Sequence, residues 1–222
     1  MSKMDKLKRI SKAHTQYKLA DGTRVPGVTT ILGVLNKPAL VKWANNLGLQ
    51  GIDSSKYVDA AARIGTLIHA MVESHITGEE LDLNDYTPNE IGQAQVGFKK
   101  FIEWKQAREF KLLLSEAPIV SEEYRYGGTV DCVAVVDGKV TLVDFKTGKG
   151  IYDEMLCQVS AYNELLKIRE IQTDEIMILR IGRNEEEGFE TRTVHINDIE
   201  TYFDIFKSCL KIYETKKKVG WR

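Results

Sequence analysis

Residues 128–146 read GTVDCVAVVDGKVTLVDFK, and the architecture of the chain can be worked out from them. Asp137-Gly138 lies between two apolar runs, which is a strong signal for a β-hairpin with a two-residue type I′ turn. A turn at these residues places Val136 opposite Lys139. The same register places Asp131 opposite Asp144, so we expect two carboxylates to meet where the hairpin opens.

Two opposed carboxylates need a compensating charge. Directly opposed Cβ atoms lie roughly 4.5–5.5 Å apart, a separation at which like charges destabilise a hairpin. A divalent cation with oxygen ligands, such as Mg²⁺ or Mn²⁺, would offset the repulsion. Lys146 follows Asp144 by two residues and therefore shares its face. The pattern predicts a metal site for the cleavage of phosphodiesters.

The alternative is an exposed, solvated charged edge. Apolar residues on both faces of the hairpin argue against it, because they indicate buried strands. The acidic face also carries Val133, Val135, Val140 and Leu142, and we assign Val130, Cys132, Val136, Val143 and Phe145 to the other face.

Composition limits the class of protein. A chain of 222 residues is long enough for one domain with a real core. The net charge of −1 gives no global basic field, so any nucleic acid must meet a local basic surface. Three widely spaced cysteines in apolar contexts predict buried thiols in a reducing compartment rather than disulfides. Since no apolar run approaches the roughly 18 residues of a membrane span, we expect no membrane association and a cytoplasmic, intracellular location.

Periodicity and turn signals predict the remaining elements. Thr87 opens a capping box with proline at the first helical position, Asp153 is a candidate N-cap, and Gly78 is a helix stop. The expected elements are a short hairpin around 21–22, helices at 37–49, 55–76, 87–109, 154–169 and 198–216, an extended segment at 119–126, and strands at 176–181 and 190–196. The middle of the chain thus runs helix, strand, strand, strand, helix, strand, which predicts an α/β fold with a mixed sheet flanked by helices.

Four separated motifs resemble the PD-(D/E)xK nuclease superfamily. They are Gly65-Thr-Leu-Ile-His69, Gly128-Thr-Val-Asp131, Asp144-Phe-Lys146 and Gln158-Val-Ser-Ala-Tyr162. Their order and spacing are similar to those of the RecB nuclease domain, phage exonucleases of that type and the mitochondrial genome maintenance exonuclease. Residues 17–170 carry the resemblance. The departures are Val130, where the superfamily name has proline, and Gly27, where relatives often have serine.

The resemblance implies a restriction-endonuclease-like core of order αβββαβ and a role for each motif residue. Asp131, Asp144, His69 and the Phe145 carbonyl would hold Mg²⁺ or Mn²⁺, and Lys146 would be catalytic together with the two aspartates. Gln158 and Tyr162 would support the acid cluster and the DNA phosphates. Without the resemblance, a single histidine on a half-apolar helix such as His69 is more often packed or hydrogen-bonded than a metal ligand. Tyr162 would then pack its helix on the sheet, with Gln158 at the margin of that contact.

Two further carboxylates are open candidates. Glu73 lies one helical turn beyond His69 and could ligate or orient a metal, although an exposed helix carboxylate is the simpler interpretation. Glu123 precedes the hairpin and is either a site carboxylate or a solvated one. Other chemistries lack support: Thr147-Gly148-Lys149-Gly150 does not complete an ATP-binding phosphate loop, and three cysteines cannot form the four-cysteine iron–sulfur cluster of some relatives.

The resemblance therefore implies a metal-dependent deoxyribonuclease, an exonuclease acting on single-stranded DNA or DNA ends in phage recombination or DNA repair. A structure-specific or restriction-like endonuclease is one alternative, and a catalytically silent DNA-binding module is another. We expect one domain over residues 1–222, comprising a flexible basic tail (1–15), a helical gating region (16–80), the nuclease core (87–196) and a C-terminal helix (198–222). The sequence leaves the oligomeric state open.

Overall fold

A computed structural model describes residues 15–221 of the chain. The expected basic tail, apart from its last residue, lies outside this range. The helices are α1 (Val28–Leu32), α2 (Pro38–Leu49), α3 (Ser54–Thr77), α4 (Pro88–Gln106), α5 (Asp153–Ile168) and α6 (Ile196–Lys218). The strands are β1 (Tyr17–Lys18), β2 (Arg24–Val25), β3 (Phe110–Ser121), β4 (Tyr126–Val136), β5 (Lys139–Lys146), β6 (Glu175–Ile181) and β7 (Phe189–Val194).

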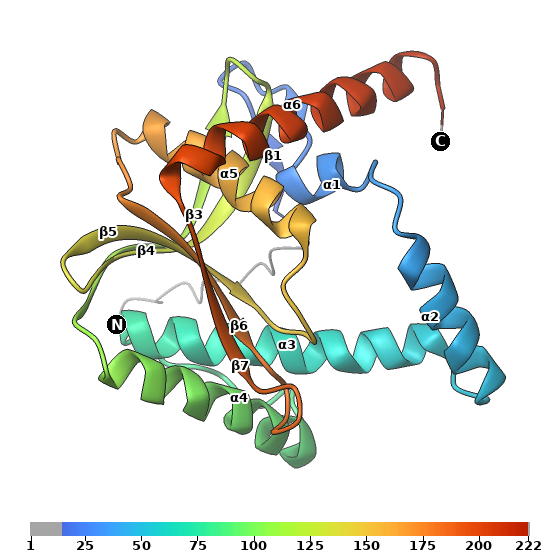
Figure 1. The fold of residues 1–222 in the computed structure, drawn as a ribbon, viewed down its shortest axis with the longest axis vertical. Helices are drawn as coiled ribbons and strands as arrows, with labels where there is room; N and C mark the ends of the chain where they lie inside the picture. Colours follow the sequence, from blue (N-terminus) through green and yellow to red (C-terminus); the bar gives the residue numbers. More distant parts are fainter. Residues whose placement is uncertain (1–14, 222) are drawn as a thin grey trace, which may run out of the picture.

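Five strands form the central sheet in the order β3-β4-β5-β6-β7 (Figure 1). Only β5 and β6 are parallel neighbours, and α5 is the crossover between them. The other neighbouring pairs are antiparallel, so the sheet is mixed. From α4 to β6 the chain follows the order αβββαβ, which confirms the predicted fold class and is consistent with a restriction-endonuclease-like core.

Helices cover both faces of the sheet. Figure 1 shows α3 and α4 on one side and α1, α5 and α6 on the other. Each side has its own apolar cluster: Leu67, Phe101 and Phe145 belong to the first, while Leu142 and Leu165 belong to the second. A sheet buried on both faces explains why its central strands read as nearly continuous apolar runs.

The β4–β5 hairpin forms as predicted. Asp137 and Gly138 have φ values of 49° and 82°, both positive, as a type I′ turn requires. The ladder runs from Val136–Lys139 to Cys132–Val143, in the expected register. The assignment of Val130 was wrong: it packs in the cluster on the α5 side, not with Cys132. Val130 lies beyond the end of the β4–β5 ladder, where it pairs with Ala117 of β3.

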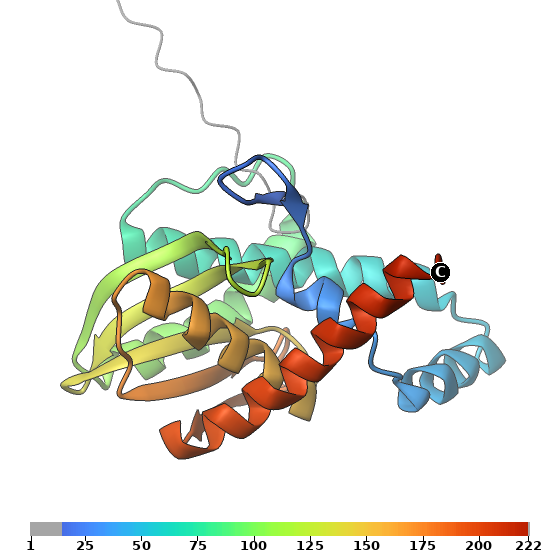
Figure 2. The same cartoon turned by 90° about the horizontal axis from the view of Figure 1, so that it is seen from above.

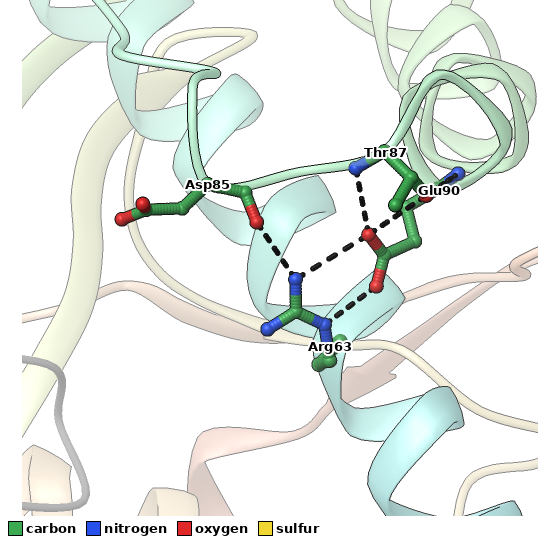
Figure 3. A network of polar contacts seen from close by, with 4 residues as sticks. All are labelled: Arg63, Asp85, Thr87 and Glu90. Carbon is green, nitrogen blue, oxygen red and sulfur yellow. Dashed lines mark hydrogen bonds and ion pairs between the residues drawn. The ribbon is translucent and has the colours of Figure 1, made fainter.

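The predicted start of α4 is confirmed, and it also anchors α3. Thr87 and Glu90 form the reciprocal capping box. Arg63 of α3 reaches the same carboxylate, with its Nε 2.5 Å from Glu90 Oε1, and donates from Nη2 to the carbonyl of Asp85 at 2.8 Å (Figure 3). The hydrogen bond from Arg63, followed by hydrogen bonds from Thr87, lowers the pKa of Glu90 from its usual 4.5 to about 2.

Several predicted boundaries needed correction. Helix α4 ends at Gln106 instead of residue 109, and β3 begins at Phe110, nine residues before the predicted extended segment. Tyr152, not Asp153, is the N-cap of α5. The short helix α1 was not among the expected elements. Gly78 has φ 77° and ends α3 as expected.

Two sequence expectations concern the whole chain. The three cysteines are buried free thiols, and burial raises the pKa of each, to about 11 for Cys157. Between residues 15 and 221 no helix has both the length and the apolar character needed to cross a membrane.

Candidate active site

Asp131 and Asp144 lie at the open end of the hairpin, one position beyond its last backbone pair. The ladder stops at Cys132–Val143, so the expected direct pairing of the two acids is not part of it. Instead, the Asp131 side chain makes the cross-strand contact: its Oδ2 accepts a 3.0 Å hydrogen bond from the main-chain nitrogen of Phe145. Both aspartates are almost fully buried, with 4% and 1% of their surfaces exposed. The structure therefore buries two carboxylates side by side, each on the residue of its strand next to the last pair of the ladder.

Lys146 brings a positive charge to this pair. It is the last residue of β5, and its Nζ contacts the carboxylate of Asp144. Its side chain is 18% exposed, so the ammonium lies at the margin of the buried region. With a neutral His69, the two carboxylates and one ammonium leave a formal charge of −1. An excess negative charge in a buried position favours the binding of a cation.

Helix α3 places His69 on the other side of Asp131. The distance from His69 Nδ1 to Asp131 Oδ2 is 3.9 Å, and the imidazole lies edge-on to the Phe145 ring. The close approach of α3 depends on Gly65, because a Cβ there would lie 2.4 Å from Thr147 Oγ1. The glycine and the histidine of one motif thus have separate tasks, since Gly65 lets the helix approach the loop after Lys146 and His69 reaches the acid pair.

Helix α5 supplies Gln158 and Tyr162. Gln158 Nε2 donates to the Tyr162 hydroxyl at 2.9 Å, as expected for residues one turn apart. Burial, and then the negative charges of Asp144 and Asp131, raise the pKa of Tyr162 well above its usual value. The Tyr162 ring packs on Gly128, where a Cβ would lie 2.6 Å from its Cε1. The second and fourth motifs therefore meet through this glycine and this ring.

The two open carboxylate candidates differ in position. Glu73 is half-buried on α3, one turn beyond His69, and remains a candidate. Glu123 is not on a strand, as the sequence suggested, but in the exposed turn between β3 and β4. Tyr126, where β4 starts, is five residues from Asp131, which corresponds to about 16 Å along a strand. Glu123 therefore lies away from the acid pair.

Sequence reasoning missed Glu116. Ser115 pairs with Cys132 and Ala117 with Val130, so Glu116 falls opposite Asp131 in the β3–β4 ladder. It is half-buried and has φ 46°, an unusual backbone conformation for a residue other than glycine. The residue would have been a candidate if the strand had been predicted to begin at Phe110.

The donor types suit a hard divalent cation. Asp131 and Asp144 supply carboxylate oxygens, the ligands that Mg²⁺ and Mn²⁺ prefer. Within the described residues, however, no three His, Cys, Asp or Glu side chains converge closely enough to form a metal-binding group. A cation at the pair would therefore need further ligands, from main-chain oxygen, water or a side chain that moves towards it. The Phe145 carbonyl and His69 remain predicted ligands.

A cavity of about 260 Å³ opens beside the site. The β1–β2 hairpin and the start of α1 line it together with Gly128 and Tyr162. Tyr17 packs closely on Gly127, and its hydroxyl lies 2.9 Å from Thr129 Oγ1. Tyr17 therefore fixes the hairpin against β4.

Comparisons with known proteins gave only distant structural likenesses. No family model and no curated protein matches the chain. A crystal structure named "putative exonuclease" from Eubacterium rectale has 12% identity over 72% of this chain and 69% of that one, with a TM-score of 0.48. SSO0001 has 14% identity over 69% and 74%, with a TM-score of 0.31. LHK-Exo in complex with dAMP has 14% identity over 72% and 91%, with a TM-score of 0.28. Likenesses of this size bear on neither activity nor substrate.

Proposed function

We propose that this protein is a metal-dependent deoxyribonuclease that hydrolyses phosphodiester bonds, acting as an exonuclease on single-stranded DNA or DNA ends. One observation carries the proposal: the β4–β5 hairpin bears two buried carboxylates, Asp131 and Asp144, and the Lys146 ammonium contacts the carboxylate of Asp144. Burying two like charges together is costly unless a cation joins them, so a purely structural role would not favour this pair.

The residues around the pair have distinct proposed tasks. Asp131 and Asp144 would hold Mg²⁺ or Mn²⁺, which when bound lowers the pKa of water and stabilises negative charge on the phosphate. Lys146, at the exposed margin, would orient the attacking water or neutralise the same charge. Gln158 and Tyr162 are hydrogen-bond donors on the α5 side and would hold the phosphate group of the substrate. His69, at 3.9 Å from Asp131, would ligate the metal or orient that carboxylate.

Cleavage of labelled linear single-stranded DNA tests the proposal. The wild-type protein should degrade it in Mg²⁺ or Mn²⁺ and be inactive in EDTA. Asp131→Asn, Asp144→Asn and Lys146→Gln should each lose at least about a hundredfold, because charge stabilisation at the phosphate is a major part of the rate enhancement. Glu123→Gln, an exposed acid away from the site, is the matched control and should retain full activity. Wild-type rates in either aspartate variant would refute the site.

A covalently closed single-stranded circle separates the exonuclease from the endonuclease. We expect linear DNA to be degraded and a circle of the same sequence to survive, because the low net charge gives no broad basic surface for capturing a strand away from its end. Residues 37–76, which carry His69 to the acid pair, are the proposed gate. Rapid cutting of the circle would replace the exonuclease with the endonuclease, and failure to cut either substrate would favour a binding module.

A further inference from the structure

Net positive charge gathers in two parts of the sequence, residues 1–14 with five Lys or Arg and one Asp, and the C-terminal residues 205–222. Residues 205–222 contain six Lys or Arg and one Glu, a formal charge of +5, so residues 1–204 together carry −6. A nucleic acid strand is attracted by a local excess of positive charge. If the proposed function is correct, on which this inference rests, the end of α6 is a place where the strand can be bound by charge.

Lys217 continues the inward face of α6. Phe206, Leu210 and Tyr213 recur at spacings of four and three residues and pack in the apolar cluster. The next position of this series is Lys217, which is exposed. The helix thus runs beyond the core that it covers, and there its inward face changes from apolar to basic.

Among the residues that the structure describes, the acidic groups leave most of these lysines unpaired. Lys211, Lys217 and Lys218 form no ion pair with any residue between 15 and 221, whereas Lys207, nearer the core, pairs with Asp204 at 2.7 Å. Lys216 lies over the ring of Trp221, 5.2 Å from its centroid. Trp221 is 70% exposed. An exposed indole beside uncompensated lysines is the combination that single-strand binding surfaces use.

The end of α6 lies at the end of the molecule towards which β5, the strand that carries Asp144 and Lys146, runs. Figures 1 and 2 both show the end of α6 and helix α2 at the same end of the molecule. In both views β5 starts at the opposite end and runs towards it, ending at Lys146. The chain that leads to α2 contributes no negative charge there, because residues 22–52 contain no Asp or Glu. A strand that enters the site from this end would meet α6 without crossing an acidic surface.

We infer that the end of α6, formed by Lys211, Lys216, Lys217, Lys218 and Trp221, binds the phosphates and one base of a single-stranded DNA substrate outside the acid pair. The competing explanation is that lysines in the last turn only stabilise the helix through its dipole. That explanation predicts an effect on melting and none on DNA affinity. It also gives no role to the exposed Trp221.

Fluorescence anisotropy with a labelled oligodeoxythymidylate in EDTA tests the inference on the full chain. We expect K216Q/K217Q/K218Q to bind at least tenfold more weakly than wild type. The slope of log affinity against log salt should fall by about 2, since each phosphate contact on a single strand contributes about 0.7. W221A should weaken binding about fivefold or more. The control K99Q/K105Q/K111Q makes the same change of charge on α4 and β3 and should bind like wild type.

The outcomes separate this inference from the proposed function. K216R/K217R/K218R keeps the three positive charges and should retain the affinity of wild type. It shows that a loss of affinity in K216Q/K217Q/K218Q comes from the lost charge and not from a less stable fold. D144N should still bind the oligonucleotide although it does not cleave. Equal affinity of K216Q/K217Q/K218Q and wild type, or an equal loss in the control variant, would overturn the inference. It would also be overturned if wild type bound phosphatidylserine vesicles but no oligonucleotide.

Discussion

The two aspartates should differ in what they do to stability, because the structure gives them different partners. At the spacing of about 5 Å that is typical of opposed positions on neighbouring strands, two carboxylates repel by about 3 kcal/mol at an effective dielectric constant of about 20. Asp131→Asn removes this repulsion and keeps an oxygen that can accept from the Phe145 main-chain nitrogen, at a cost of about 1 kcal/mol for the weaker hydrogen bond. We expect the metal-free variant to gain about 2 kcal/mol.

Asp144→Asn removes the same repulsion but also the contact with Lys146. Breaking a largely buried ion pair costs about 3–5 kcal/mol, so the net change is a loss of about 0–2 kcal/mol. The two variants should therefore differ by about 2–4 kcal/mol in the free energy of unfolding. For a chain of this size this corresponds to a difference of about 4–16 °C in Tm.

Thermal and urea unfolding in EDTA and in excess Mg²⁺ measure this difference. Mg²⁺ should raise the Tm of the wild type and of neither variant, because a ligand stabilises only the state that binds it. Equal destabilisation by both substitutions in EDTA would refute the assignment of Lys146 to Asp144. Stabilisation of either variant by Mg²⁺ to the wild-type extent would refute the acid pair as the metal site.

Three further predictions follow from individual contacts. His69→Ala should lower cleavage strongly and raise the Mn²⁺ concentration needed for half-maximal activity; a destabilised protein with normal metal dependence would make His69 a packing residue. Gly128→Ala should lower the free energy of unfolding by about 1–3 kcal/mol, because the added Cβ would lie 2.6 Å from Tyr162 Cε1. The control Gly92→Ala, where α4 leaves open space for a Cβ, should be neutral or stabilising. Equal Tm values for the two variants would contradict the packing of Tyr162 on Gly128. The pKa of Glu90 is lowered in the folded state to about 2, so its carboxylate stabilises the fold above about pH 4.5, and this contribution is lost as the pH falls towards 2. The Tm of wild type should exceed that of Glu90→Gln at pH 7, and the difference in Tm should disappear as the pH is lowered to 2. A difference in Tm that stays constant with pH would contradict this role of Glu90.

Local chemistry explains which elements could be predicted. The Asp137-Gly138 turn, the capping box at Thr87 and the stop at Gly78 each depend on a few neighbouring residues, and each was confirmed. Once the turn was known, the register of β4 and β5 followed from the two-residue period of a strand. The neighbouring positions of Asp131 and Asp144 at the open end of the hairpin could thus be predicted from sequence, although the end of the ladder at Cys132–Val143 and the Asp131–Phe145 hydrogen bond could not.

Contacts between distant segments explain what was missed. The run Leu112-Leu113-Leu114 has no clear alternation, and a register irregularity falls within it, so β3 was predicted to begin too late and Glu116 was overlooked. Gly65 and Gly128 were recognised only as parts of motifs. Their physical role, the close approach of Thr147 and Tyr162, depends on how α3 and α5 pack on the sheet.

Binding of Mn²⁺ to the metal-free protein, measured by calorimetric titration together with cleavage on the same samples, tests the central claim most directly. The account predicts that the wild type binds Mn²⁺ and degrades linear single-stranded DNA. Asp131→Asn and Asp144→Asn should lose both properties while remaining folded, and Glu123→Gln should keep both. Wild-type Mn²⁺ binding or cleavage in a folded aspartate variant would contradict the claim that these two carboxylates form a catalytic metal site.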